Sequence, residues 1–185
     1  MTTKTPITNP EAIISEIQRK PAAQLHALQE YLDGCQSLTT DPSLDVSILS
    51  EIKAGKAAER IADFKRYPIE FYARQLADEW VAENVKELVA LLRSKLTERS
   101  AGKESFISTI GKRAATISRE MFSSASNRQQ LALEREKLES EADELESAIV
   151  DAGNLIHFLE AEPSLDSFRA AEAGIARVQT ASVPA

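Results

Sequence analysis

Residues 103–160 decide the fold, and they read KESFISTIGKRAATISREMFSSASNRQQLALEREKLESEADELESAIVDAGNLIHFLE. From Ile107 onward, apolar residues recur in steps of three and four that keep one phase. This seam comprises Ile107, Ile110, Ala114, Ile117, Met121, Leu131, Leu138, Ala142, Leu145, Ile149, Ala152, Ile156 and Leu159. Such heptad spacing is typical of helices that pack side by side, knobs into holes. We predict an all-α fold, an elongated helical bundle whose arm over about 103–160 is a helical hairpin or a coiled coil.

The two forms of the arm differ at residues 123–127, where the sequence SSASN interrupts the apolar seam. Ser and Asn favour helix caps over helix interiors, because their side chains compete for backbone hydrogen bonds. Ser126, followed by Gln129 three residues later, has the spacing of a capping box that opens a second helix. A turn here produces a hairpin, whereas its absence leaves one rod of roughly 85–90 Å.

The charges beside the seam favour the hairpin. In a parallel, in-register dimer of rods, Glu134 would face Glu139 of the partner and Glu141 would face Glu146, which are repulsive contacts. Residues 93–128 instead carry eight Lys or Arg and three Glu. A hairpin would place the acidic side chains Glu134, Glu139, Glu141 and Glu146 beside these cations. An exposed ion pair, however, contributes only about 0–1 kcal/mol.

The composition fits a helical protein without a membrane span. Only 5% of the 185 residues are aromatic, so the core volume must come mainly from aliphatic side chains. There is no apolar run of the length that a span requires, and the first 20 residues contain no secretory h-region. A lone cysteine, Cys35, cannot form an internal disulfide. We expect a cytoplasmic location, and a virion interior fits equally well.

Helix signals divide the region before the arm. Asn9-Pro10 is a helix start, Lys20-Pro21 is expected to end that helix, and Gly34 is expected to end the next one. A third helix is predicted to open at Asp41-Pro42 and to continue through Gly55, which weakens it by about 1 kcal/mol relative to Ala.

Later signals complete the division into elements. Tyr67-Pro68 marks a boundary, a long helix is predicted over about 69–99, and Gly102 separates it from the arm. Gly153-Asn154 is a possible break, and Glu162-Pro163 begins a last amphipathic piece. We predict three parts: short helices in 1–66, long helices in 67–161, and a short helix with a tail in 162–185.

The sequence contains no recognisable catalytic or metal-binding pattern. His26 and His157 are far apart and form no two-histidine motif, and Cys35 has no base beside it. Two Gly-Lys pairs, at 55–56 and 102–103, lack both the first glycine of a phosphate loop and the Ser or Thr that follows its lysine. We therefore predict no enzyme activity, no cofactor, no metal and no small-molecule substrate.

The long seam and several short amphipathic helices predict a non-enzymatic protein–protein interaction module, a subunit or scaffold of a larger assembly. The residues expected to bind a protein partner or a second copy are Leu131, Leu138, Leu145, Ile149 and Ile156. The alternative is a nucleic-acid-binding protein that contacts the phosphate backbone. Its candidate residues are Arg93, Arg99, Lys103, Lys112, Arg113 and Arg119. Phe106 and Phe122 are expected to follow the apolar face, so we do not expect them to stack on bases.

Overall fold

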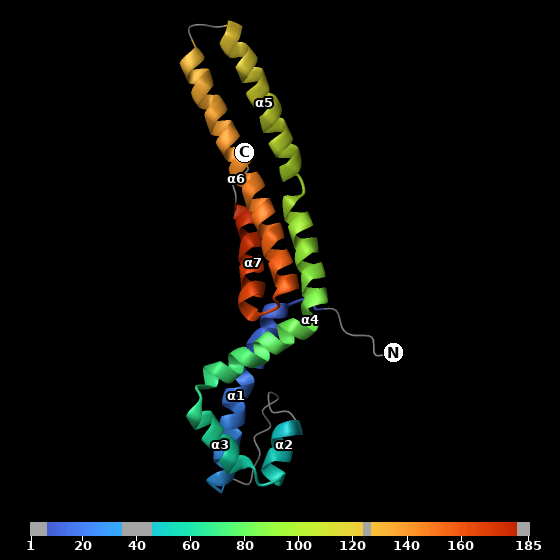
Figure 1. The fold of residues 1–185 in the computed structure, drawn as a ribbon, viewed down its shortest axis with the longest axis vertical. Coiled ribbons are helices and arrows are strands. Elements are labelled where there is room, and N and C mark those ends of the chain that lie inside the picture. Colours follow the sequence, from blue (N-terminus) through green and yellow to red (C-terminus); the bar gives the residue numbers. More distant parts are fainter. Residues whose placement is uncertain (1–6, 35–45, 124–126, 181–185) are drawn as a thin grey trace, which may run out of the picture. The chain divides into compact units, whose positions relative to one another are not determined.

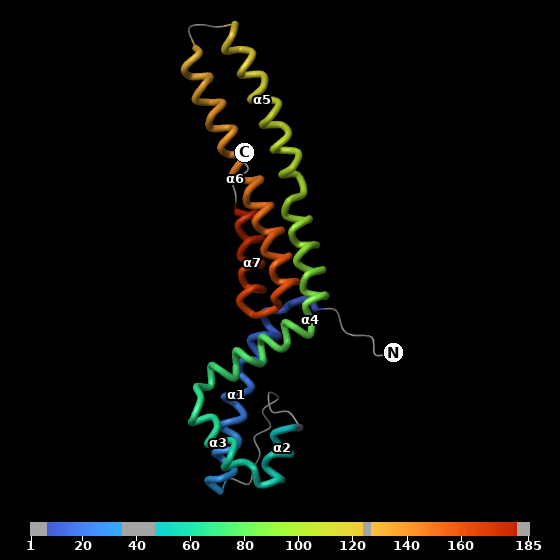
Figure 2. Tube along the Cα trace, viewed as in Figure 1, coloured from blue at the N-terminus to red at the C-terminus, as the bar shows by residue number. Residues whose placement is uncertain are grey.

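The computed structural model describes residues 7–34, 46–123 and 127–180 (Figures 1 and 2). Within these ranges the chain forms seven α-helices and no strand, which confirms the all-α prediction. The helices are α1 (Pro10–Leu32), α2 (Val46–Lys53), α3 (Ala57–Arg66), α4 (Ile69–Ser100), α5 (Lys103–Ser123), α6 (Arg128–Ala161) and α7 (Leu165–Thr180). Cys35, Ser126 and the predicted helix start at Asp41-Pro42 lie outside the described residues.

The chain has two compact units, Met1–Asn84 and Val85–Ala185, whose boundary lies within α4. Each unit has its own core, and the two are described separately below. The three-part division expected from the sequence remains a prediction.

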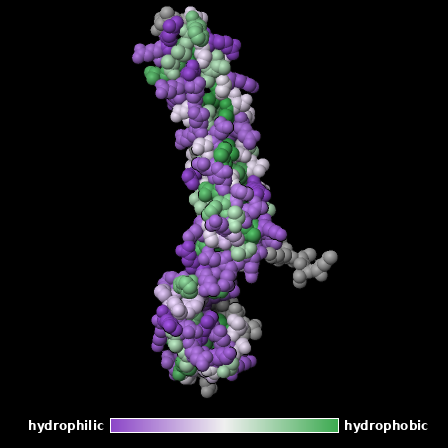
Figure 3. All heavy atoms as spheres, viewed as in Figure 1, coloured by the Kyte–Doolittle hydropathy of each residue, from purple (hydrophilic) through white to green (hydrophobic). Residues whose placement is uncertain are grey.

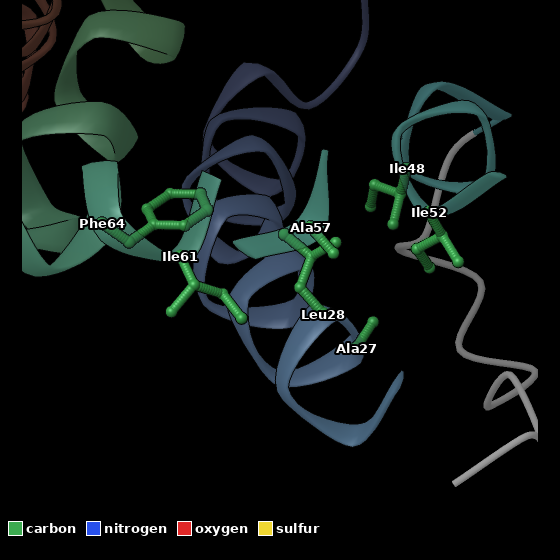
Figure 4. Close-up of a cluster of buried hydrophobic side chains, with 7 residues drawn as sticks. All are labelled: Ala27, Leu28, Ile48, Ile52, Ala57, Ile61 and Phe64. Atoms are coloured by element: carbon green, nitrogen blue, oxygen red, sulfur yellow. The ribbon is translucent and has the colours of Figure 1, made fainter. Parts of the chain in front are cut away.

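The first unit is built around α1. Asn9 caps this helix, because its Oδ1 accepts a hydrogen bond from the backbone N of Ala12 at 3.2 Å. Buried side chains of α2 and α3 surround the last turns of α1 and form the core of the unit (Figure 4). These core residues are Ala27, Leu28, Ile48, Ile52, Ala57, Ile61 and Phe64.

Pro21 does not end α1, so this prediction is wrong. The helix runs unbroken from Pro10 to Leu32 with Pro21 inside it. Proline removes one hydrogen bond from a helix interior and crowds the preceding turn. Here, however, its apolar ring is fully buried. Burial of the ring offsets part of that cost. The helix propensity of proline is a local quantity and does not include such a tertiary contact. Gly34, by contrast, follows the end of α1 with a positive φ of 86°, as expected.

Gly55 does more than weaken a single helix. Its φ of +71° is left-handed, and it separates α2 from α3. The apolar residues on either side of Gly55 still share one core, because Ile48, Ile52 and Ile61 are all buried in it. The boundary at Tyr67-Pro68 is confirmed, because α3 ends at Arg66 and α4 begins at Ile69.

In the second unit, α6 packs against α5 along its first part and against α7 along its last part (Figure 1). Contacts across α5 and α6 show that the two helices are antiparallel. Arg128 Nε donates to the carbonyl oxygen of Met121 at 3.1 Å, and Arg113 Nη2 lies 3.2 Å from Glu134 Oε1. The arm is therefore a helical hairpin, as the charge pattern favoured. Residues 124–126 of its connection lie outside the described residues.

The α6–α7 contact depends on one glycine. A Cβ added to Gly174 would lie 2.8 Å from Leu155 Cδ1 and 3.3 Å from the Cα of Ala152, so this position fits only a glycine without adjustment. Gly153 does not break α6, contrary to the sequence expectation. The buried residues Ala152 and Ile156 flank it, and their packing outweighs a propensity cost of about 1 kcal/mol.

The beginning of α7 is fixed by two serines. The backbone N of Ser164 donates to Ser167 Oγ at 2.9 Å, and the backbone N of Ser167 donates to Ser164 Oγ at 3.1 Å. This reciprocal arrangement satisfies two amide groups that a helix start leaves without partners. The amphipathic face predicted for this segment is confirmed, because Leu165, Phe168 and Val178 are buried.

Candidate interaction surface of the α5–α6 hairpin

The seam residues of α6 differ in burial along the helix. Leu145 and Ile156 are each 2% exposed, whereas Leu131, Leu138 and Ile149 are only partly buried. In this conformation Leu145 and Ile156 therefore support the fold of the unit. Their binding to a partner, like that of the three half-buried residues, remains a prediction.

Half of the predicted basic surface forms contacts within the chain. Arg93 Nη2 lies 2.7 Å from Glu160 Oε2, and Arg113 contacts Glu134. Lys103 Nζ donates to the carbonyl oxygen of Val178. The structure therefore brings these three cations to partners of α6 and α7 rather than together on one exposed patch.

The remaining three cations, Arg99, Lys112 and Arg119, are exposed. Lys112 and Arg119 lie two helical turns apart on the outer face of α5, with Thr116 between them. The Arg119 Nε donates weakly, at 3.4 Å, to the carbonyl oxygen of Ala115. Lys112 and Arg119 together form only a small basic patch on α5.

Phe122 does not follow the apolar face, so this expectation is wrong. Its side chain is 87% exposed at the end of α5, while Phe106 is partly buried. The physical reason is register: Met121 occupies the seam, and the next residue of a helix points about 100° away from it. That offset was readable from the sequence. Figure 3 shows apolar side chains among hydrophilic ones at this end of the hairpin.

An open hollow of about 400 Å³ lies beside Phe122. Its lining residues come from both helices and are Ser118, Met121, Phe122, Arg128 and Arg135. The guanidinium of Arg135 contacts Glu139 at 3.1 Å and donates to Ser118 Oγ at 3.4 Å. The hollow thus combines an aromatic ring, a thioether and two guanidinium groups, a mixture that suits an apolar side chain with a polar rim.

The hollow identifies one side of the hairpin, which we name the α5–α6 flank. On α5 it continues at helical spacing along small residues, and on α6 along small and charged residues. The flank comprises Gly111, Ala115, Ser118 and Phe122 of α5 with Arg128, Ala132, Arg135 and Glu139 of α6. A Cβ added to Gly111 would meet no atom within 4 Å, so this part of the flank is open. Close approach of another helix is sterically possible here.

A second exposed apolar group lies in the first unit, where α3 meets α4. Tyr67 and Phe71 are 46% and 55% exposed, and their rings stack with centroids 5.8 Å apart. Tyr72 packs edge-on against Phe64 at 5.1 Å and joins this group to the core. Arg66 lies 5.9 Å from the centroid of Tyr67. Tyr72 itself is half-buried.

The described residues offer no arrangement for metal chemistry. Among them there is no group of three His, Cys, Asp or Glu side chains that could hold a metal ion. His26 and His157 are each beside a glutamate of the same helix, Glu30 at 3.5 Å and Glu160 at 3.9 Å. None of the described helices has an apolar stretch long enough to traverse a bilayer.

Comparison with known proteins finds no relative of this chain. The sequence matches no protein-family model, and neither the curated proteins nor the solved structures include a match.

Proposed function

We propose that this chain is a non-enzymatic helical module that binds other protein surfaces, and that the α5–α6 flank is its binding surface. The observation that carries the proposal is the 87% exposure of Phe122 beside the hollow. Full burial of a Phe side chain contributes about 1.5–3 kcal/mol. A partner that covers Phe122 would recover much of this free energy, which the isolated chain forgoes.

The composition of the flank supports the same proposal. Aromatic residues, Met and Arg are enriched at the centres of protein–protein interfaces, and all three types line the hollow. A cytoplasmic location, or a virion interior, is part of the proposal and rests on the sequence alone.

The experiment uses the photoreactive residue p-benzoylphenylalanine, placed at position 122 or at position 133. Leu133 is the matched control, because it is also a large apolar side chain, 61% exposed, near the same end of the hairpin. Helical spacing places it on a different side of α6 from Arg128 and Arg135. We expect a cross-linked protein at position 122 that is absent at position 133.

The cross-linked protein is then purified and titrated against the wild-type chain and Phe122→Asp. We expect the variant to bind at least about 10-fold more weakly while it retains the helical circular dichroism of the wild type. Identical cross-links at the two positions, or equal affinity of the two chains, would refute the proposal.

A second candidate function is binding of a nucleic-acid backbone, which the exposure of Lys112 and Arg119 on one face of α5 favours. Two phosphate contacts predict a shallow dependence on salt, with a slope of about −1.8 in log Kobs against log salt for duplex DNA. The double variant Lys112→Glu, Arg119→Glu should abolish retention of duplex DNA at about 20 mM salt, measured by fluorescence anisotropy. Absence of binding by the wild type under that condition excludes this candidate.

A further inference from the structure

The heptad phase of the hairpin continues through its connection. When the polar seam positions Ser124, Arg128 and Arg135 are counted, steps of three and four residues alternate without exception from Ile107 to Leu159. An antiparallel hairpin does not require this alternation, because its turn lets the two helices be oriented separately. Roughly one connection length in seven would keep the phase by chance. A single continuous helix, by contrast, needs the phase in order to present one apolar stripe.

A continuous helix cannot cover its own seam, so it needs the helices of a second copy. Two such helices that lie antiparallel place α5 of each copy beside α6 of the other. This is the same pairing that α5 and α6 form within one chain (Figure 1). Glu134 of one copy then meets Arg113 of the other, as it does within the hairpin. The repulsion between glutamates that a parallel dimer would create therefore does not arise.

The other contacts of the second unit can also form between two copies. The packing of α7 on α6 does not involve the connection, so these two helices can move together. They contact the preceding helices through Lys95, whose Nζ lies 3.2 Å from Glu172 Oε1, and through Lys103, which donates to the carbonyl oxygen of Val178. The closed and the exchanged states therefore contain the same contacts. They differ mainly at the connection and in the free energy of association.

We propose that this chain exchanges α6 and α7 between two copies. The hairpin opens at the connection between α5 and α6, and α6 with α7 of each copy packs on α5 and the last part of α4 of the other. The connection consists only of residues 124–127, and short connections between paired elements favour exchange of this kind. Its serines and asparagine disfavour a helix interior, so the closed hairpin predominates in dilute solution.

The inference goes beyond the proposed function and does not rest on it. Exchange re-forms each contact between α5 and α6 with the other copy, so it covers no part of the α5–α6 flank. An exchanged dimer carries two such flanks on one particle, which suits a scaffold that binds more than one protein surface.

Refolding at two concentrations tests whether exchange occurs. The full chain is refolded from urea at about 1 µM and at about 200 µM, because refolding allows copies to pair before each hairpin closes. Its mass is then measured by sedimentation. We expect 20.3 kDa at the low concentration and a fraction with twice this mass at the high concentration. A chain that stays at 20.3 kDa after refolding at the high concentration overturns the proposal.

A cross-link between α5 and α6 separates exchange from any other kind of dimer. Arg113→Cys and Glu134→Cys, in a Cys35→Ser background, place one thiol on each helix at positions whose native side chains are in contact. A short bismaleimide joins the two thiols in the dilute monomer, and the joined hairpin cannot open. The joined chain should remain at 20.3 kDa after refolding at the high concentration, whereas the unjoined variant should dimerise. Equal dimerisation of the joined and unjoined chains overturns exchange.

Two insertions into the connection test the role of the phase. Seven added alanines keep the alternation of three and four, whereas five turn the α6 stripe by about 200° relative to that of α5 in a continuous helix. The closed hairpin accommodates either insertion, because its turn does not depend on the phase. We expect the chain with seven alanines to dimerise at least about 10-fold more tightly than the chain with five. Equal dimerisation of the two chains overturns the proposal.

The outcomes are independent of the cross-link to a partner at position 122. If the chain stays monomeric while position 122 captures a different protein, exchange is overturned and the proposed function stands. If the chain exchanges while position 122 captures no protein, the proposed function is refuted and the exchange stands.

Discussion

Replacing Gly174 with alanine tests the contact between α6 and α7 directly. The added Cβ would lie 2.8 Å from Leu155 Cδ1, 3.3 Å from the Cα of Ala152 and 3.6 Å from its Cβ. Leu155 can change rotamer, but the Cα of Ala152 moves only with the backbone of α6. Overpacking of this kind costs about 1–3 kcal/mol. Alanine also gains about 1 kcal/mol over glycine in a helix, so we expect a net loss of about 0–2 kcal/mol.

Gly153→Ala is the matched control, because Gly153 also lies inside a helix but an added Cβ meets no atom within 4 Å. This variant should be more stable than the wild type by about 0.5–1 kcal/mol. The difference between the two variants isolates the steric term, since both remove the same backbone freedom from the unfolded chain. It should amount to about 1–3 kcal/mol.

The assay is unfolding in urea, followed by circular dichroism at several protein concentrations. We expect Gly174→Ala to lower the midpoint and Gly153→Ala to raise it, with unchanged slopes. If the two variants stabilise the chain equally, the backbones of α6 and α7 do not approach as closely as described, and the reasoning fails. Mixed transitions would be separated by fitting the two units independently, because the chain need not unfold in one step.

Three further predictions concern stability. Ser167→Ala removes one half of the reciprocal cap with Ser164 and should destabilise the second unit by about 1 kcal/mol in urea unfolding. Leu145→Ala should cost about 2–5 kcal/mol because Leu145 is buried, and half-buried Leu138 should lose about half as much on the same change. Arg60→Ala should lower the melting midpoint of the first unit, because Arg60 covers two aromatic rings at 5.4 and 5.9 Å; Arg60→Lys should recover only part of the loss, as it lacks the planar guanidinium.

The hairpin was the most predictable part of the fold. The apolar residues of 107–159 keep one period, and only helices that pack along their length use that period. The choice between hairpin and rod needed a second signal, the opposite charges of the two halves. One of the expected ion pairs, Arg113 with Glu134, is present in the structure. Arg119 has its Nε directed at its own helix instead, because the strength of exposed pairs is too small to fix long side chains.

The errors share a physical origin, which is that local propensity cannot anticipate what a residue will pack against. Pro21 and Gly153 both carry a helix-breaking propensity of about 1–3 kcal/mol, and both lie inside continuous helices. In each case burial, of the Pro21 ring itself or of the neighbours of Gly153, opposes that cost. Gly55 shows the converse, because no buried contact opposes its left-handed conformation and the chain breaks there.

The sequence pattern and the structure point to different residues of the hairpin as a candidate site, and the binding of a partner by the seam residues stays a prediction. The prediction placed partner binding on the most regular apolar residues, such as Leu145 and Ile156, and the same regularity lets the chain's own helices cover them. A residue that binds a partner must be left over after the intramolecular packing is complete, so it is a residue that departs from the period. Phe122 is such a residue, adjacent to a seam position and out of phase with it. An external contact at Phe122 therefore requires no rearrangement of the hairpin, whereas one at Leu145 or Ile156 requires these buried side chains to be uncovered.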